Sequence, residues 1–220
     1  AENIGITQGR DEKEAKALIQ KAEGGDVESQ IELGEIYAAG KKVPKDPEKA
    51  LKWIRMAAES GHADALTVQG LLLEFGFEVD KDINKAFILY REAAAQGDAK
   101  AQFCLGRLFL FGEEGIQKDY QKALKWLNKA AEQDLAESQY LLGVLYESGL
   151  GVDKNHEEAV KLYRKAAEQG DPDAQLGLAT KYYYGEGIEQ NFKLAFEWGM
   201  KAAKQGHAEA QNSIGVMYEN

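Results

Sequence analysis

The chain has 220 residues, a formal net charge of −10 and 44% hydrophobic residues. This acidic balance, with no basic stripe, makes nucleic acid and anionic membrane surfaces poor partners. No apolar run approaches the length of a membrane span, and the single cysteine, Cys104, excludes an internal disulfide framework. We expect Cys104 to be a buried small apolar residue. The composition is compatible with a cytoplasmic, periplasmic or secreted location.

Taken in chain order, residues 1–10 show no helical period, and residues 11–24 are predicted to form a helix that packs beneath another at 29–39. The opening residues 1–3 lie at nearly the same phase of the repeat described below as the closing residues 218–220. We therefore expect the chain to be a window cut from a longer array. A complete protein with frayed ends is the alternative.

A short motif, Leu-Gly-x-x-Tyr or a close variant, recurs along the chain with the spacing of an amphipathic helix. Its last residue advances by 36, 36, 37, 36 and 36 positions, through Tyr37, Leu73, Phe109, Tyr146, Tyr182 and Tyr218. A second helical pattern follows each of the first five copies. One such hairpin buries too little surface to be stable alone. Self-similarity at this period therefore predicts a solenoid of stacked hairpins.

The second helix of each hairpin has regular start and stop signals. An Asp or Asn lies four residues before its first alanine, which is typical of an N-cap: Asp46, Asp82, Asp119, Asn155 and Asn191. Glycines that suit left-handed helix ends follow at Gly61, Gly97, Gly170 and Gly206. The remaining hairpin is irregular, because it ends in Asp134-Leu135 and carries one extra residue at 112–115.

These motifs resemble those of the Sel-one-like repeat family, relatives of the tetratricopeptide repeats. The resemblance runs from the helix near Ala17 to Tyr218 and includes two Gly-x-Gly turns, at 149–152 and 185–188. Tetratricopeptide repeats themselves would have a period of 34 and a closing proline, whereas this chain has a period near 36 and a closing glycine. The resemblance implies an all-α fold, a right-handed α/α superhelical solenoid.

The period divides the chain into repeats of one continuous domain, 1–220. The predicted divisions are an incomplete unit at 1–28, full repeats at 29–64, 65–100, 101–137, 138–173 and 174–209, and the first helix of a sixth at 210–220.

A glycine in the middle of each first helix predicts close helix packing, because glycine costs about 1 kcal/mol there relative to alanine. We expect Gly143→Leu to lose several kcal/mol by overpacking, and Gly143→Ala to be far milder.

No catalytic or metal-binding pattern stands out in the sequence. His62 and His207 occupy the same turn position in different repeats and read as helix-start residues, and His156 opens an exposed helix. No His-x-x-x-His or Cys-x-x-Cys spacing occurs. None of the serines has a lysine three positions on, as a β-lactam-binding site would require. We expect no cofactor, no metal and no enzymatic activity.

In a solenoid of this kind the first helices line the concave wall. Side chains that point away from the Leu-Gly-Tyr stripe are predicted to face this groove, Glu74 and Glu147 among them. Aromatic, aliphatic and arginine side chains are the types that anchor protein interfaces. The predicted partner-binding residues are Leu71, Phe75, Phe103, Arg107, Phe111, Tyr140, Val144, Tyr183 and Tyr184.

Two alternatives remain open for these residues. Phe103 and Tyr140 lie in a column that would serve equally well as core between adjacent first helices. Phe75, Phe111, Tyr183 and Tyr184 lie nearer the loops and are expected to be partly exposed, because three consecutive tyrosines at 182–184 cannot share one helical face.

The sequence thus predicts a non-catalytic, monomeric adaptor that holds a protein or peptide in its concave groove. The resemblance implies adaptor roles in bacterial signalling, envelope and host-interaction systems and in eukaryotic membrane-protein quality control. Two alternatives are a cell-wall or β-lactam-acting enzyme, suggested only by labels that some relatives of the family carry, and a structural spacer between flanking domains.

Overall fold

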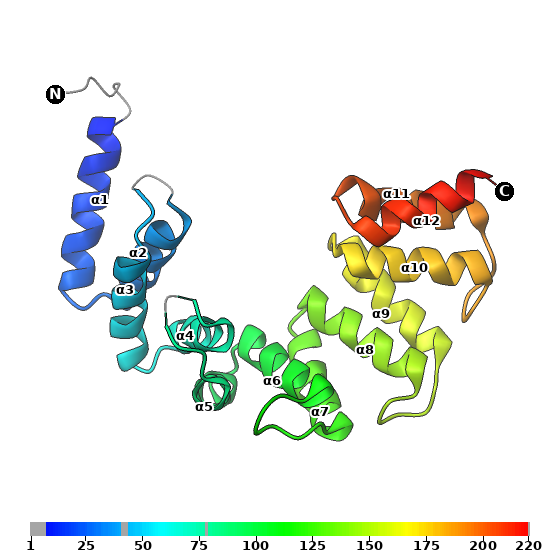
Figure 1. Cartoon of the computed structure of the whole chain (residues 1–220), viewed down its shortest axis with the longest axis horizontal. Coiled ribbons are helices and arrows are strands. Elements are labelled where there is room, and N and C mark those ends of the chain that lie inside the picture. The colour runs from blue at the N-terminus through cyan, green and yellow to red at the C-terminus, as the bar shows by residue number, and fades with distance from the viewer. Residues whose placement is uncertain (1–7, 41–43, 78, 220) are drawn as a thin grey trace. The chain divides into compact units, whose positions relative to one another are not determined.

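A computed structural model describes residues 8–40, 44–77 and 79–219, with side chains from 16 to 213 within these ranges. In the described part, every regular element is a helix (Figure 1). The helices are α1 (Gln8–Glu23), α2 (Val27–Ala39), α3 (Pro47–Glu59), α4 (Ala63–Phe75), α5 (Ile83–Ala95), α6 (Ala99–Phe111), α7 (Tyr120–Ala131), α8 (Ala136–Ser148), α9 (His156–Glu168), α10 (Pro172–Tyr184), α11 (Phe192–Lys204) and α12 (Ala208–Glu219).

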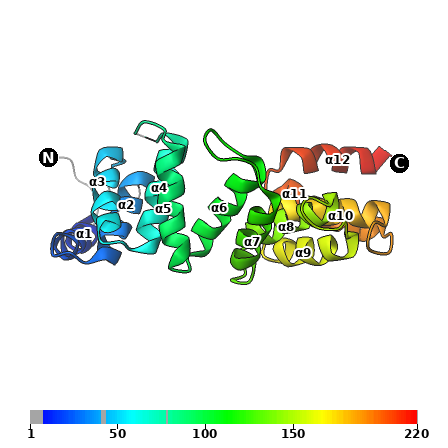
Figure 2. The same cartoon turned by 90° about the horizontal axis from the view of Figure 1, so that it is seen from below.

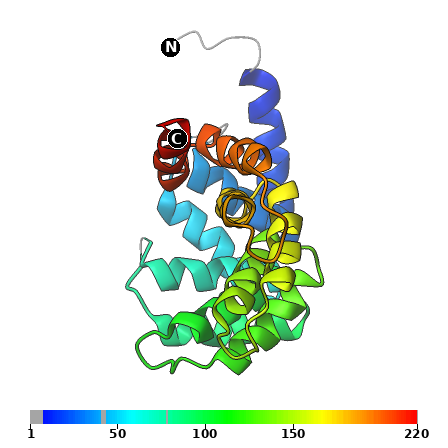
Figure 3. The ribbon, with the colours of Figure 1, turned by 90° about the vertical axis from the view of Figure 1, so that its right-hand side faces the viewer.

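The chain divides into two compact units, residues 1–101 and 102–220. In the first unit α2 packs on α3 and α4 on α5, and in the second α8 packs on α9 and α10 on α11. Each hairpin also touches a neighbour within its unit: α3 contacts α4, and α10 lies beside both α9 and α11 (Figure 2). The last helix, α12, lies against α11 (Figure 3). The predicted stacking of hairpins in an all-α repeat solenoid is confirmed; the predicted repeat boundaries stay a prediction.

The predicted caps of the second helices are confirmed. Each cap side chain accepts a hydrogen bond from the backbone N–H three residues further on, as Asn155 does from Glu158. Its own N–H donates to the carbonyl of the motif's last residue, so that Asn155 N–H bonds to Tyr146 at 2.8 Å. The first bond starts the helix and the second closes the hairpin, and each cap contributes about 1 kcal/mol. The same pair of bonds forms at Asp46, Asp82, Asp119 and Asn191.

The helix ends also agree with the sequence. The four predicted stop glycines have φ between +78° and +101°, a region that costs other residues roughly 1–2 kcal/mol. Asp134 occupies the equivalent place in the irregular hairpin and has φ +60°. Among the described residues it is the one non-glycine residue with positive φ.

The motif glycines Gly34, Gly70, Gly106 and Gly143 each face a large side chain of their own hairpin. A Cβ on Gly143 would lie 2.6 Å from the Tyr163 ring, and one on Gly70 would lie 2.5 Å from the Tyr90 ring. The same closeness joins Gly34 to Ile54 and Gly106 to Leu127. Close packing is therefore confirmed. The expectation that Gly143→Ala is far milder than Gly143→Leu stays a prediction, although even one methyl group at Gly143 would overlap the Tyr163 ring.

Buried glutamines form hydrogen bonds both between and within repeats. Gln175, in α10, donates to the carbonyl of Ala167 on α9 at 3.2 Å, and its own side-chain carbonyl accepts from Gln205, directly after α11, at 2.9 Å. Gln139 accepts from Gln169 in the same way at 2.8 Å. A buried amide is stable only when its polar atoms are paired, so these bonds explain why a polar residue recurs at this core position.

Candidate partner-binding surface

The predicted partner-binding residues fall in both units. Leu71 and Phe75 lie on α4 in the first unit, and the other seven lie on first helices of the second unit. The second unit brings most of them together, so the site is described there. We call the stripe of α8 and α10 that carries Glu137, Tyr140, Val144, Asp173 and Tyr184 the first-helix face.

Exposed aromatic rings lie where the first helices end. Phe75 is 70% exposed at the end of α4, Phe111 is 58% exposed at the end of α6, and Tyr184 is 65% exposed at the end of α10. Of the three consecutive tyrosines, Tyr182 is buried and Tyr183 is half-buried, so the expectation that at least one would be exposed is confirmed. These rings are the accessible apolar surface of the predicted set.

Tyr183, Tyr184 and Phe192 form what we call the aromatic patch. The ring centroids of Tyr183 and Tyr184 are 5.0 Å apart with the planes at 82°, and those of Tyr183 and Phe192 are 5.3 Å apart at 73°. Both are edge-to-face contacts, the geometry that aromatic pairs prefer. Phe192 is exposed and was missed from the sequence, where its only signal is an apolar residue directly after the cap Asn191.

The central residues of the first-helix face are partly core. Tyr140 and Val144 are half-buried and pack against the cluster that contains Tyr163 and Leu178. The ring of Tyr140 lies 5.7 Å from that of Tyr163. Leu71, Phe103 and Arg107 are likewise half-buried. The structure thus gives Tyr140 both roles considered above, because one part of its ring is packed and the other is accessible.

Glu74 and Glu147 were expected to face the groove, and here the structure corrects the sequence. Glu74 is only 5% exposed and accepts a hydrogen bond from the Tyr90 hydroxyl at 2.8 Å. Glu147 accepts from the Tyr163 hydroxyl at 2.5 Å. Each acid lies sixteen residues before its tyrosine. The two pairs satisfy phenol groups that would otherwise be buried without a partner.

A buried lysine completes the Glu147 network. Lys181 is 1% exposed and pairs with Glu147 and, at 2.6 Å, with Glu186 in the turn after α10. Burial opposes its charge, but the hydrogen bonds that Lys181 donates to both carboxylates prevail and raise its pKa. The hydrogen bond from Lys181 lowers the pKa of Glu186. Burial, with the bond to Glu147, raises the pKa of Tyr163, which stays a neutral donor.

In the second unit, the first helices α8, α10 and α12 differ in charge from the second helices, whereas the first helix α6 carries Lys100 and Arg107. Lys181 is the one basic residue in α8, α10 and α12, whereas α7, α9 and α11 together hold nine lysines and arginines. Acidic side chains stand in the first turns of α8, α10 and α12, at Glu137, Asp173 and Glu209. The first-helix face is therefore acidic.

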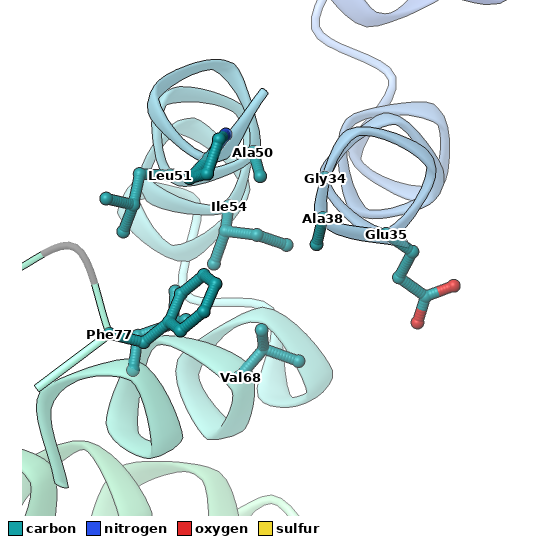
Figure 4. A pocket seen from close by; sticks show the side chains of 10 residues that line it. Gly34, Glu35, Ala38, Ala50, Leu51, Ile54, Val68 and Phe77 are labelled. Carbon is teal, nitrogen blue, oxygen red and sulfur yellow. The ribbon is translucent and has the colours of Figure 1, made fainter. Parts of the chain in front are cut away.

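The first unit has a small apolar cavity between α2, α3 and α4 (Figure 4). It holds about 80 Å³ and is lined by Ala38, Ile54, Val68 and Phe77 among others, with the Glu35 carboxylate turned away from it. Ala38 stands where the other repeats carry Glu74, Leu110, Glu147 and Tyr183, so the missing side-chain volume explains the gap. Nothing in the sequence analysis predicted it.

Cys104 and His207 lie as the sequence predicted. Cys104 is buried. His207 lies at a helix start, where its ring accepts from the N–H of Ala210, and it hydrogen-bonds Asp173 at 2.8 Å. Among the described residues, no group of three His, Cys, Asp or Glu side chains is placed to hold a metal ion. No helix in the described ranges is both long and apolar enough to cross a membrane.

The geometry defines the class of protein first: an α-helical repeat solenoid built from stacked hairpins. The model of the Sel1 repeat then matches five segments, 27–62, 65–98, 99–135, 136–171 and 172–207. The chain therefore belongs to the Sel1 repeat family, and the resemblance stated from the sequence is confirmed. Sel1 repeat proteins are generally scaffolds for protein interactions and generally non-catalytic.

Solved structures of bacterial proteins share the fold. A Sel1 repeat protein from Oxalobacter formigenes is 36% identical, with a TM-score of 0.80 over 88% of this chain and 77% of that one. The protein c5321, a protective antigen of uropathogenic Escherichia coli with an SLR fold, is 34% identical, with a TM-score of 0.77 over 91% of this chain. The chain spans 43% of the length of c5321. No curated protein matches.

Proposed function

We propose that this chain is a non-catalytic interaction module that binds a partner protein through the first-helix face and the aromatic patch of its second unit. The observation that carries the proposal is the exposure of aromatic rings at the ends of first helices, in a family that generally scaffolds protein interactions. Large aromatic side chains contribute most of the energy at protein interfaces, and a contiguous exposed apolar patch usually marks one.

Phe111 and Arg107 extend this surface onto α6, where Phe111 is again the last helical residue. The half-buried Tyr140 and Val144 supply its centre. Rings that are already packed on one edge lose little conformational freedom on binding, which favours affinity. The alternatives raised from the sequence, a cell-wall enzyme and a spacer, are favoured by no arrangement of the described residues.

The test uses the full chain to capture partners, followed by titration calorimetry with the partner that is identified. Tyr184→Ser and Phe111→Ser should each weaken binding by roughly 30-fold, the effect of losing about 2 kcal/mol at an aromatic anchor. Ile88→Ser is the matched control, because Ile88 is 60% exposed but lies on the second helix α5. An unchanged affinity in the first two variants, with a loss in Ile88→Ser, would refute the proposed surface.

A further inference from the structure

The difference in charge between the first helices α8 and α10 and the second helices indicates the chemical class of the partner. We propose that the first-helix face of the second unit binds a basic segment of another protein, with a lysine or arginine side chain seated over Tyr140 beside Glu137 and Asp173. The inference rests on the proposed function and adds the chemical class of the partner.

The position of Tyr140 supports a cation at this place. Its ring is held by Tyr163, at 5.7 Å between centroids, and is only half-buried, so part of it is accessible. Aromatic rings attract ammonium and guanidinium groups, more strongly when the pair is shielded from water. Glu137 lies one helical turn before Tyr140 on α8 and is exposed. Two features that favour a cation, a ring and a carboxylate, thus occur together.

The charges of further carboxylates, on α8 and at the start of α10, also act on the same ring. Burial, and then the charges of Asp173, Asp171 and Glu147, raise the pKa of Tyr140. The field that opposes a phenolate there favours a positive charge. Asp171 is engaged as the cap of α10, and Asp173 meets His207, but the Asp173 side chain remains 53% exposed. Glu147 is engaged by Lys181. Glu137 and Asp173 are therefore the carboxylates best placed to meet a partner.

The second helices α7 and α11 carry rings that are already paired with a lysine of the same helix. On α7, Lys129 lies over the ring of Trp126 at 4.9 Å, and on α11, Lys201 lies over Trp198 at 3.7 Å. There the chain supplies both the cation and the ring. On α8 and α10 it supplies rings and carboxylates, while the single lysine is buried. A basic partner complements the first-helix face, and an acidic one is repelled.

The aromatic patch fixes where the apolar part of the partner would lie. It is about two turns further along the helix direction than Tyr140, an axial offset of roughly 10–15 Å at 1.5 Å per residue, and the spacing between α8 and α10 adds to this offset. An extended peptide therefore needs at least about three to five residues to cover the distance. The expected segment has a lysine or arginine and, at least about four residues away, a leucine or aromatic residue.

A random 12-residue peptide library displayed on phage, selected against the immobilised full chain, tests the inference without a known partner. Selected peptides should be enriched in lysine and arginine spaced from an apolar residue. The tightest is then synthesised and its dissociation constant measured. Glu137→Gln with Asp173→Asn should weaken it by roughly 5- to 30-fold. Glu157→Gln with Glu168→Gln on α9, which removes the same charge from the second-helix side, should change it less than about twofold.

Four results would overturn the inference. Selected peptides could be acidic or uncharged. Both double variants could also weaken binding equally, which would mean that the effect depends on the net charge of the chain and not on where the carboxylates lie. Sedimentation velocity could instead show a dimer that Glu137→Gln with Asp173→Asn dissociates, which would make a second copy the occupant. Tyr184→Ser could abolish binding of the selected peptide while the carboxylate variants leave it unchanged. The proposed function would then stand, but the inference that the partner is basic would be refuted.

Discussion

Two glycines on opposite edges of one buried ring allow close packing to be tested within a single site. A Cβ on Gly143 of α8 would lie 2.6 Å from one edge of the Tyr163 ring, and a Cβ on Gly177 of α10 would lie 3.4 Å from the other edge. The Tyr163 ring is 2% exposed, and its hydroxyl is fixed by Glu147. Both glycines are helical, so replacing either with alanine gains about 1 kcal/mol of helix propensity.

The two substitutions should nevertheless change the free energy of unfolding in opposite directions. To restore the usual carbon–carbon separation of about 3.5–4.0 Å, Gly143→Ala must displace the ring by roughly 1 Å against α10 and away from Glu147. Overpacking of this kind costs about 1–3 kcal/mol, and occasionally more, so we expect a net loss of about 1–2 kcal/mol after the propensity gain. Gly177→Ala makes an ordinary contact and should stabilise the chain by up to about 1 kcal/mol.

Urea unfolding of the full chain, followed by circular dichroism, measures both effects. The double variant adds a third test, because the ring cannot retreat from Ala at 143 when Ala at 177 closes the other side. Its loss should exceed the sum of the single effects by at least about 0.5 kcal/mol. A Gly143→Ala chain as stable as the original, with an unchanged denaturant slope, would refute the argument.

Three further predictions concern stability. Gln30 Oε1 is buried without a hydrogen-bond partner among the described residues, because Ser60 stands where later repeats carry glutamine; Ser60→Gln should therefore raise the free energy of unfolding by about 0.5–1.5 kcal/mol, as measured by urea titration. Asp134→Gly should add about 0.5–1 kcal/mol by removing a positive φ from a non-glycine residue, and a lower midpoint of thermal unfolding would contradict this. Lys181 lowers the pKa of Glu186 in the folded state. The ion pair therefore stabilises the fold above the ordinary pKa of Glu186, near 4.5, and this stabilisation is lost as the pH falls below that value. The stability difference between the original chain and Glu186→Gln should shrink from pH 7 to pH 3.5, and a constant difference would exclude the ion pair as its cause.

Much of the fold could be predicted because the repeat makes local signals redundant. A cap such as Asn155 or a stop such as Gly170 is a weak signal alone, but five copies at one period leave little freedom in where the helices begin and end. The close approach at Gly143 was also readable, since a costly glycine at a core position needs a packing reason. The stability cost of adding a methyl group at Gly143 could not be predicted from the sequence, because it depends on how tightly Tyr163 is held by groups from other helices.

The candidate site was harder to predict, because helical position does not reveal which polar groups pair. Glu74 and Glu147 were placed in the groove by their spacing, although a signal was present: both repeats that carry tyrosine at the facing core position carry glutamate sixteen residues earlier. Lys181 stands where other repeats have Ile36, Leu72, Leu108 or Leu145. Sequence alone does not show that two carboxylates neutralise it in the interior.

The glutamine bonds within and between repeats also limit how such a chain could change its length. Gln175 uses a carbonyl from the helix before it and offers its own oxygen to Gln205, thirty residues later, and Gln139 bonds to Gln169 across the same interval. Deleting or duplicating one whole period leaves every such donor opposite an equivalent acceptor. A deletion of half a period strands an amide inside the protein. Gene rearrangements that add or remove complete hairpins are thus the ones this interior tolerates, and the extent of the proposed binding surface would vary in steps of one repeat.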